Sequence, residues 1–140
     1  MTKGTAALLL GLAAVAGCHQ PIAVDTKAAQ TIPAEIAVEG LRDLLPKAAF
    51  LGCGEPTISF MQDEIKSWKI DDKGVEFQPK GKDAYRMPYS SIKGSQLTKV
   101  ILSYEVRLFV GERDFFRFNW REEQPSRRAL EFFEALRDAR

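Results

Sequence analysis

The chain of 140 residues has few of the side chains that usually carry catalysis or hold a metal. It contains two cysteines, Cys18 and Cys53, and a single histidine, His19. A catalytic Ser/His/Asp or Cys/His set needs an oriented imidazole, and His19 lies in a segment without a sustained apolar pattern. The sequence also contains no CxxC or HExxH motif and no glycine-rich phosphate loop. We therefore expect a protein that is not an enzyme, with no catalytic residue, no metal site and no cofactor.

An excess of charge of either sign is also missing. Lys and Arg number 20 against 19 for Asp and Glu, and the formal net charge is +1 at pH 7. Because nucleic-acid-binding domains usually carry a clustered basic excess, this balance excludes nucleic acid from the predicted partners. The fractions of hydrophobic and charged residues, 45% and 28%, are those of an ordinary globular chain.

The chain lacks an apolar run long enough to cross a membrane. A spanning helix needs about 20 apolar residues. The run at residues 6–14, AALLLGLAA, is followed within a few positions by Gly17, Cys18 and His19. With Lys3 before it and small residues after it, this run is typical of a cleaved targeting segment rather than a retained anchor. We predict that residues 1–17 are a signal peptide.

The four residues Val15-Ala16-Gly17-Cys18 resemble the lipobox of bacterial lipoproteins. In that family the cysteine sulfur is alkylated with diacylglycerol, the chain is cleaved before the cysteine, and the new amino group is often acylated. The resemblance implies that Cys18 is the lipidation site and that the protein contacts the membrane through this lipid anchor. Each buried methylene of an acyl chain contributes about 0.8 kcal/mol, so that two or three chains anchor a protein stably. A plain secretory signal peptide is the alternative.

The same resemblance implies a place in the bacterial cell envelope. His19 rather than Asp follows Cys18, which in a cell with two membranes resembles lipoproteins passed to the outer membrane, facing the periplasm. Residues 18–32 mix Pro21 with small residues and isolated charges, and we expect the lipidated cysteine and a flexible tether there. Residues 33–140 are predicted to form a single globular domain.

Lipidation of Cys18 would leave Cys53 without a disulfide partner in the chain, because a thioether sulfur cannot form a disulfide. Cys53 lies between Gly52 and Gly54 in a segment that also holds Pro56, which indicates a break in regular structure. An unpaired cysteine is usually a small buried hydrophobe, and we favour this interpretation. The alternatives are a reactive thiol whose pKa is lowered by a neighbouring cation, or an intermolecular disulfide.

Residues 33–47 predict a short amphipathic helix packed on the body of the domain. Its apolar residues recur at helical spacing, and Pro33 and Pro46 lie near its two boundaries. After Pro56 the pattern changes to short β-like runs separated by turn residues. These runs are residues 57–61, 64–70, 75–78, 84–89 and 115–120, with a hairpin turn predicted at residues 71–74.

Between Val100 and Val110 the apolar residues fall mainly on alternate positions, which is the period of a strand rather than a helix. Either one long bent strand or two strands that meet near residues 103–105 would account for this pattern. Residues 124–140 predict a C-terminal amphipathic helix. Its apolar stripe comprises Ala129, Leu130, Phe133 and Leu136.

These elements predict an α+β domain with a short N-terminal helix, an antiparallel sheet or partly open barrel of about seven strands, and a C-terminal amphipathic helix. The order resembles the pleckstrin-homology-like fold and its GRAM-like relatives in the stretches WKIDDKGVEF, MPYSSI, VRLFVGERDFFRFNW and ALEFFEALR. Many pleckstrin-homology domains bind phosphoinositides through a basic first hairpin loop. The corresponding stretch here contains Asp63 and Glu64, which argues against such binding.

The missing catalytic set, the lipobox and the pleckstrin-like order favour a non-catalytic, lipid-anchored binding or scaffold protein of the envelope, with an envelope protein as partner. The alternative is a carrier or sensor of a lipid or other apolar ligand, held in a pocket between the sheet and the C-terminal helix. We interpret the aromatic residues there first as ordinary core, and the arginines near the helix first as a solvated face. These residues are Phe115, Phe116, Phe118, Trp120, Phe132 and Phe133, and Arg121, Arg127 and Arg128.

Overall fold

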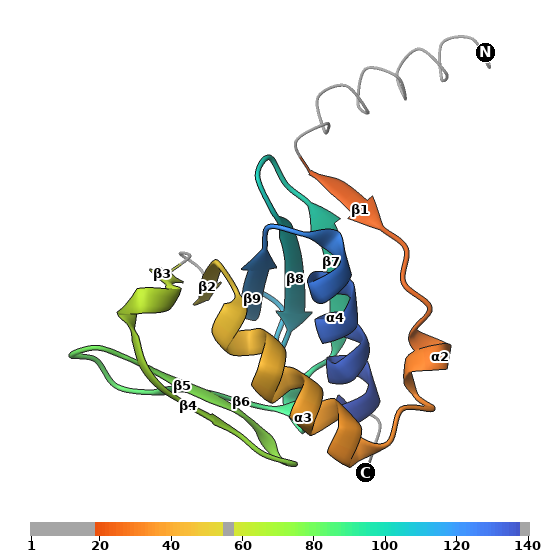
Figure 1. Ribbon diagram of the computed structural model, residues 1–140, viewed down its shortest axis with the longest axis horizontal. Helices are drawn as coiled ribbons and strands as arrows, with labels where there is room; N and C mark the ends of the chain where they lie inside the picture. Colours follow the sequence, from red (N-terminus) through yellow and green to blue (C-terminus); the bar gives the residue numbers. More distant parts are fainter. Residues whose placement is uncertain (1–18, 55–57, 138–140) are drawn as a thin grey trace, which may run out of the picture.

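The computed structural model describes residues 19–54 and 58–137. The predicted signal peptide and Cys18 lie outside these residues. The described part of the chain is α+β, as the sequence predicts, with two antiparallel sheets and two main helices, α3 (Ala34–Leu44) and α4 (Glu123–Arg137) (Figure 1). Both sheets are open rather than closed into a barrel. Over the described residues, no helix is both long enough and apolar enough to cross a membrane.

The larger sheet has six strands in the order β1-β7-β8-β9-β2-β3. A row of buried apolar side chains crosses its inner face from strand to strand, because residues paired in register point to the same side of a sheet. This row is the centre of the core and consists of Leu97, Val106, Phe118, Leu51 and Phe60. The strands are β1 (Gln20–Ile22), β2 (Phe50–Cys53), β3 (Ile58–Met61), β7 (Gly94–Lys99), β8 (Tyr104–Phe109) and β9 (Phe115–Trp120).

A smaller sheet packs against the same inner face. Phe77 in its central strand is fully buried, and its ring meets those of Phe116 and Phe118 edge-on, at centroid distances of 6.3 and 6.4 Å. One hydrophobic core therefore joins both sheets. The three strands are β4 (Ile65–Ile70), β5 (Gly74–Pro79) and β6 (Tyr85–Pro88), in that order across the sheet.

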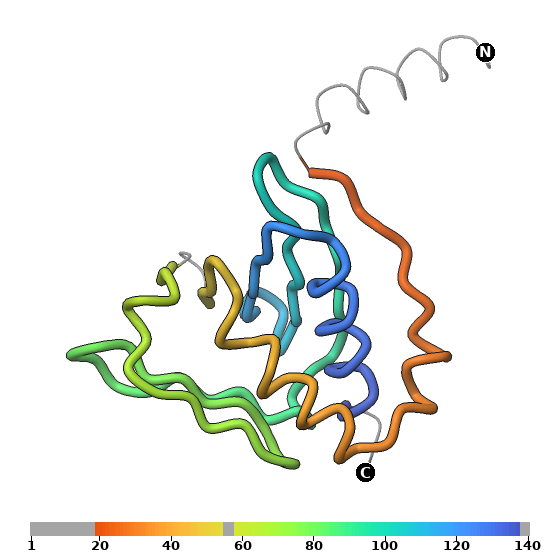
Figure 2. Tube along the Cα trace, viewed as in Figure 1, coloured from red at the N-terminus to blue at the C-terminus, as the bar shows by residue number. Residues whose placement is uncertain are grey.

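The helices α3 and α4 pack against each other, and α4 covers strands β7, β8 and β9 (Figure 2). The apolar stripe predicted for the C-terminal helix is buried, and Phe133 stacks on Phe118 of the sheet at 5.7 Å. α3 ends at Leu44 and continues as the 3-10 turn η2 (Leu45–Lys47), which contains Pro46. The end of the N-terminal helix is therefore close to where its proline predicts it.

The segment that follows Cys18 contains regular structure, whereas the sequence predicts a flexible tether there. Its residues form β1, which pairs antiparallel with β7, and the short helix α2 (Thr26–Ala29), which contacts α4. The Asp25 carboxylate caps α2 by accepting hydrogen bonds from two backbone N–H groups, each at 3.1 Å. We call residues 20–32 the N-terminal arm. The arm contacts the domain through β1, through buried Ala29 of α2 and through the partly buried side chains of Ile22, Val24 and Ile32. Because β1 and α2 have only three and four residues, neither shows a sustained apolar period in the sequence.

Between Val100 and Val110 the structure has one strand, β8, and neither a strand that begins at Val100 nor two strands that meet near residues 103–105. Residues 100–103 form the turn of a hairpin in which β8 pairs with β7, which ends at Lys99. The N–H of Val100 donates to the C=O of Ser103 at 2.9 Å and closes this turn. Ile101 and Leu102, at its tip, are 74% and 85% exposed. Because both are apolar, the sequence pattern continues through the turn and hides its position.

β2 runs through the segment that the sequence predicts to be a break. Gly52 is required there because a Cβ atom would collide with the backbone C=O of Ile58 on the neighbouring strand. The break follows Cys53, at Gly54, whose φ of 77° favours glycine. The two glycines on either side of Cys53 therefore have different roles, which their shared identity in the sequence does not reveal.

Candidate functional site

Adjacent acidic residues are the plainest candidates for acid–base chemistry, and the first such pair, Asp71 and Asp72, lies in the β4–β5 turn. The Asp71 carboxylate accepts hydrogen bonds from the backbone N–H groups of Lys73 at 2.9 Å and Gly74 at 3.0 Å. Chiefly the hydrogen bond from Lys73 holds the pKa of Asp71 below its ordinary value. A carboxylate that is kept ionised by turn geometry stabilises the hairpin and is a poor general acid.

The second acidic pair, Glu122 and Glu123, is divided between two environments. Glu123 forms an ion pair with Arg127 one helical turn away at 2.8 Å. Glu122 lies on the rim of the surface cleft described below. In the described part of the chain, no three His, Cys, Asp or Glu side chains lie close enough together to hold a metal ion.

A polar cluster occupies the outer face of the larger sheet. The buried carboxylate of Glu105 lies 2.9 Å from the Arg107 guanidinium and 3.7 Å from that of Arg117. Asn119, opposite Glu105 in register, donates to the Ser103 hydroxyl at 3.0 Å. Such an ion-paired network holds the strands in register and offers no activated nucleophile.

Cys53 lies in β2 and is buried. Burial raises the pKa of its thiol, the Asp114 carboxylate raises it further, and Arg117 opposes both effects. A raised pKa leaves little of the thiolate that reacts with disulfides or oxidants. The environment of Cys53 therefore favours the inert, buried interpretation over a reactive one.

The six aromatic residues considered for an apolar pocket do not surround a common space. Phe118, Trp120, Phe132 and Phe133 are buried in the core. Phe115 belongs to the outer face of the sheet, where the Arg107 guanidinium lies 4.3 Å from its ring centroid. Phe118 and Phe133 stack between the sheet and α4 at 5.7 Å, which favours the interpretation as ordinary core.

The three arginines near α4 have different surroundings. Arg127 pairs with Glu123, and Arg128 pairs with Glu131 at 3.1 Å while its guanidinium lies 4.6 Å from the Phe132 ring centroid. These contacts match the solvated, charge-balanced helix face that the sequence predicts. Arg121 is different because it lines the cleft.

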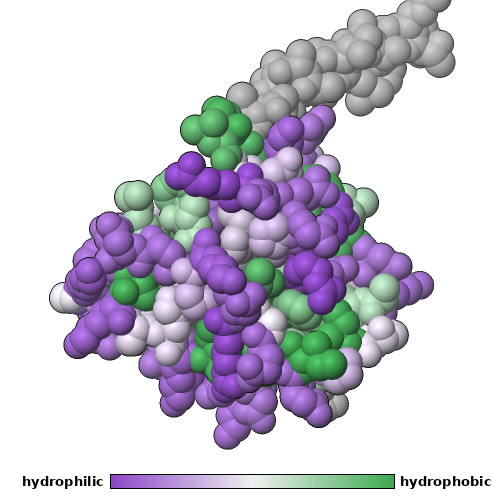
Figure 3. Space-filling model, in the orientation of Figure 1, coloured by the Kyte–Doolittle hydropathy of each residue, from purple (hydrophilic) through white to green (hydrophobic). Residues whose placement is uncertain are grey.

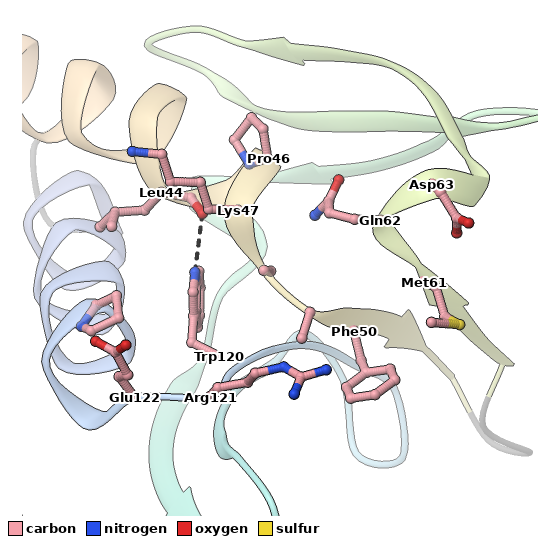
Figure 4. Close-up of a pocket in the computed structure, with 13 residues that line it drawn as sticks. Leu44, Pro46, Lys47, Phe50, Met61, Gln62, Asp63, Trp120, Arg121 and Glu122 are labelled. Atoms are coloured by element: carbon pink, nitrogen blue, oxygen red, sulfur yellow. Dashed lines mark hydrogen bonds between the residues drawn. The ribbon is translucent and has the colours of Figure 1, made fainter.

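A surface cleft of about 560 Å³ is the strongest candidate for a binding site (Figure 4). Three segments form it, and they are far apart in the sequence. They are the end of α3 with η2, the β2–β3 pair with the 3-10 turn η3 (Gln62–Glu64), and the connection from β9 to α4.

Two hydrogen bonds fasten the walls of the cleft to one another. The Trp120 indole N–H donates to the C=O of Leu44 at 3.0 Å, which ties β9 to the end of α3. The Gln62 side-chain amide donates to the C=O of Leu45 at 2.8 Å, which ties η3 to the same place. Because both bonds lie within the protein, the cleft is formed before any ligand arrives.

The cleft presents apolar side chains to solvent. Phe50 and Met61 lie opposite each other on β2 and β3, and they are 38% and 53% exposed. Large apolar side chains that gather in a concave surface mark an interaction site more strongly than single exposed ones. Phe50 and Met61 are therefore the residues most directly available to a ligand.

Charges of both signs surround these apolar side chains. Four charged residues, two basic and two acidic, line the cleft: Lys47, Arg121, Asp63 and Glu122. In Figure 4 the Arg121 side chain extends along the cleft toward Phe50. Polar rims around an apolar centre are the usual arrangement of a protein-binding surface.

No protein-family model, curated protein or solved structure matches the chain. The resemblances to bacterial lipoproteins and to the pleckstrin-homology-like fold therefore rest on the residues quoted for them and stay predictions.

The sequence pattern does not single out Phe50 or Met61. Phe50 comes just before the glycines that predict a break in regular structure. Met61 ends a strand of four residues, which is too short to show from the sequence which face is buried. The available signal was the apolar run AAFL after Pro46, which suits a strand. Its partner strand is known only from the fold.

Proposed function

We propose that this chain is a lipid-anchored, non-catalytic binding protein of the bacterial cell envelope that holds an envelope protein at the cleft beside Phe50 and Met61. The lipobox supports the anchor at Cys18, and His19 after it favours the outer membrane, on the side that faces the periplasm. Asp71, Glu123, the Glu105 cluster and Cys53 have structural environments, which supports a role in binding rather than catalysis.

The exposure of Phe50 and Met61 in a preformed cleft is the observation that carries the binding role. Aromatic residues, Met and Arg are enriched in protein–protein interfaces, where a few large side chains provide most of the binding energy. The cleft brings one residue of each kind together in Phe50, Met61 and Arg121. Its charged rim suits the side chains of a protein better than it suits an acyl chain.

A carrier of a small apolar ligand is the second candidate, and the size of the cleft favours it. About 560 Å³ falls within the range of small-ligand pockets, roughly 300–1,000 Å³. An acyl chain, however, gains most from enclosure, and rings such as Phe118 and Phe133 fill the interior between α4 and the sheet. A partner protein therefore accounts better for the open, charged rim.

The anchor is tested by the substitution Cys18→Ser in the full chain expressed in bacteria. We expect an uncleaved precursor without lipid, because only a thiol can form the thioether. Metabolic labelling with a fatty-acid probe measures the result, and Cys53→Ser serves as the matched control that should label normally. Normal labelling of Cys18→Ser would show that the chain is not a lipoprotein of this type.

The cleft is tested by photo-cross-linking in native membranes, with p-benzoylphenylalanine in place of Met61. Ile36 is the matched control position, because it is also 53% exposed but lies on α3. We expect a discrete protein adduct from position 61 that position 36 does not give and that Phe50→Ser removes. Adducts with lipid alone from position 61 would favour the carrier, and equal protein adducts from both positions would contradict binding at the cleft.

A further inference from the structure

The β7–β8 turn projects two large apolar side chains into solvent. Ile101 and Leu102 are 74% and 85% exposed, the highest values for large hydrophobic residues in the described part of the chain. In Figure 3 a strongly hydrophobic projection stands at the end of the molecule where Figure 1 shows this turn. Water contact with adjacent side chains of this size is unfavourable, so that the turn gains from an apolar environment.

The fold itself has no need of apolar residues at this position. The hydrogen bond between Val100 and Ser103 closes the turn through backbone atoms alone. The central positions of tight turns usually hold Gly, Asn, Asp, Ser or Pro, and neither Ile101 nor Leu102 belongs to the hydrophobic core. Apolar residues at turn positions that usually hold other residue types, without a core contact in return, point to a functional requirement.

Chain direction places this turn at the end of the sheet from which the lipid-bearing segment leaves. β1 runs antiparallel to β7, with Gln20 opposite Lys99. Cys18 precedes Gln20 by two residues, and Ile101 follows Lys99 by two residues. Consecutive Cα atoms are 3.8 Å apart, so that two residues of chain span at most about 8 Å. An acyl group on Cys18 would draw this end of the sheet to the bilayer.

We propose that the Ile101–Leu102 tip inserts into the same bilayer that holds the lipid on Cys18, an inference that rests on the anchor in the proposed function. Lys99 is exposed at the base of the tip, where an ammonium group suits anionic headgroups. Its Nζ lies 6.0 Å from the ring centroid of half-buried Tyr104, a residue type enriched at membrane interfaces. Lipid and tip together form two attachment points and set the orientation of the domain.

The orientation has a consequence for the cleft. Tyr104 pairs in register with Trp120, so that Arg121 follows β9 at the same end of the larger sheet as the tip. Insertion of the tip therefore holds the cleft near the membrane surface. A partner at the cleft would be one that lies at or in that membrane.

The test uses the lipidated protein purified from bacterial membranes and reconstituted in vesicles of phosphatidylethanolamine and phosphatidylglycerol. A spin label is attached at Leu102→Cys in a Cys53→Ser background, and the matched control carries it at Ile36→Cys. Collision with oxygen, which partitions into the bilayer, is compared with collision with a water-soluble nickel complex. Mass spectrometry of the same sample shows whether Cys18 carries lipid.

We expect nickel accessibility at position 102 to be at least about threefold lower than at position 36, with oxygen accessibility higher, because the tip is surrounded by acyl chains. A spin label at position 101 should gain nickel accessibility when Leu102→Asp is added, because a charged side chain keeps the tip out of the bilayer. The control substitution Ile36→Asp should leave the nickel accessibility of that label low.

Equal nickel accessibility at positions 102 and 36 in lipidated protein would overturn the insertion while leaving the anchor intact. Shielding of position 102 from both oxygen and nickel would indicate a protein contact and would also overturn it. A mass without lipid would instead show that the anchor in the proposed function is wrong.

Discussion

At the scale of the residue, Gly40 shows how one missing side chain sets the distance between two helices. Alanine in the interior of a helix is normally better than glycine by about 1 kcal/mol. A Cβ atom at Gly40 of α3, however, would overlap the Phe132 ring of α4, which is buried beneath Arg128. We expect Gly40→Ala to lower the free energy of unfolding by about 1–2 kcal/mol, since overpacking outweighs the gain in propensity. Urea denaturation measures this change.

Two further variants separate packing from other effects of the Gly40 substitution. Gly94→Ala is the control, because the nearest atom to its Cβ would be the Phe109 Cδ2 at 3.9 Å, and we expect a change within about 0.5 kcal/mol. Phe132→Leu should make Gly40→Ala less costly, and a double-mutant cycle measures this coupling. An unchanged or raised stability of Gly40→Ala alone would contradict the packing role.

Asp71 illustrates a polar residue whose effect depends on pH. Its pKa is lowered in the folded protein, so that its stabilisation is present above the ordinary carboxyl pKa, about 3.9, and is lost as pH falls through the lowered folded value. We expect Asp71→Ala to cost about 1 kcal/mol at pH 7. The difference from the unsubstituted protein should shrink toward pH 3, as urea denaturation at both pH values would show.

Neighbouring substitutions make the Asp71 prediction specific. Asp72→Ala, in the same turn, should have little effect at either pH, because Asp72 is exposed. Asp71→Asn should lose part of the stability that Asp71 contributes at pH 7, since its amide oxygen can accept the same backbone hydrogen bonds but without the charge that strengthens them. A loss at Asp71→Ala that is equal at pH 7 and pH 3 would mean that the ionised carboxylate is not the stabilising group.

At the scale of the element, the short helix α2 of the N-terminal arm has one buried side chain. Ala29 is buried where α2 meets the domain, whereas its neighbour Ala28 is exposed. We expect Ala29→Arg to release α2 and to speed amide hydrogen exchange in residues 20–32 at least about tenfold, because a guanidinium cannot replace a buried methyl group. Exchange in β8 should change little.

Ala28→Arg is the matched control for the arm, because it places the same side chain on the solvent side of α2. It should leave exchange in residues 20–32 unchanged. Equal effects of the two substitutions, or no effect of Ala29→Arg, would show that the arm is not held by this face of α2.

The elements also differ in how well their sequences predict them. The C-terminal helix and β9 carry complete patterns, because each buries a continuous face against the core, and both occur where the sequence places them. The sequence predicts no strand at residues 94–99, where β7 lies, and the apolar pattern from Val100 hides the turn before β8, because Ile101 and Leu102 are apolar although exposed. β1 consists of three residues at a sheet edge, too few to show any period.

At the scale of the whole molecule, a shared core should make the two sheets unfold together. Phe77 of the smaller sheet contacts Phe116 and Phe118 of the larger one. The two tryptophans report on different sheets, since Trp68 lies in β4 and Trp120 lies in β9. The variant Trp68→Phe keeps only Trp120, and Trp120→Phe keeps only Trp68. In each variant, we expect the urea midpoint measured by tryptophan fluorescence to equal the urea midpoint measured by circular dichroism.

We expect Phe77→Leu to lower the urea midpoint reported by Trp68 and the urea midpoint reported by Trp120 by the same amount. The loss of ring contacts across the sheets is expected to cost about 1–3 kcal/mol. A shift seen by Trp68 but not by Trp120 would mean that the smaller sheet unfolds as a separate unit.

The sequence alone determined the α+β class, most strand and helix positions, and the lipobox that predicts an anchor at Cys18, because these features are written in neighbouring residues. Only the tertiary structure brought Phe50, Met61 and Arg121 together in one cleft and put the Ile101–Leu102 tip beside the start of β1. Such sites depend on which strands pair, and pairing joins residues that are tens of positions apart. The local sequence pattern does not show which strands pair, so that the binding surfaces can be located only in the fold.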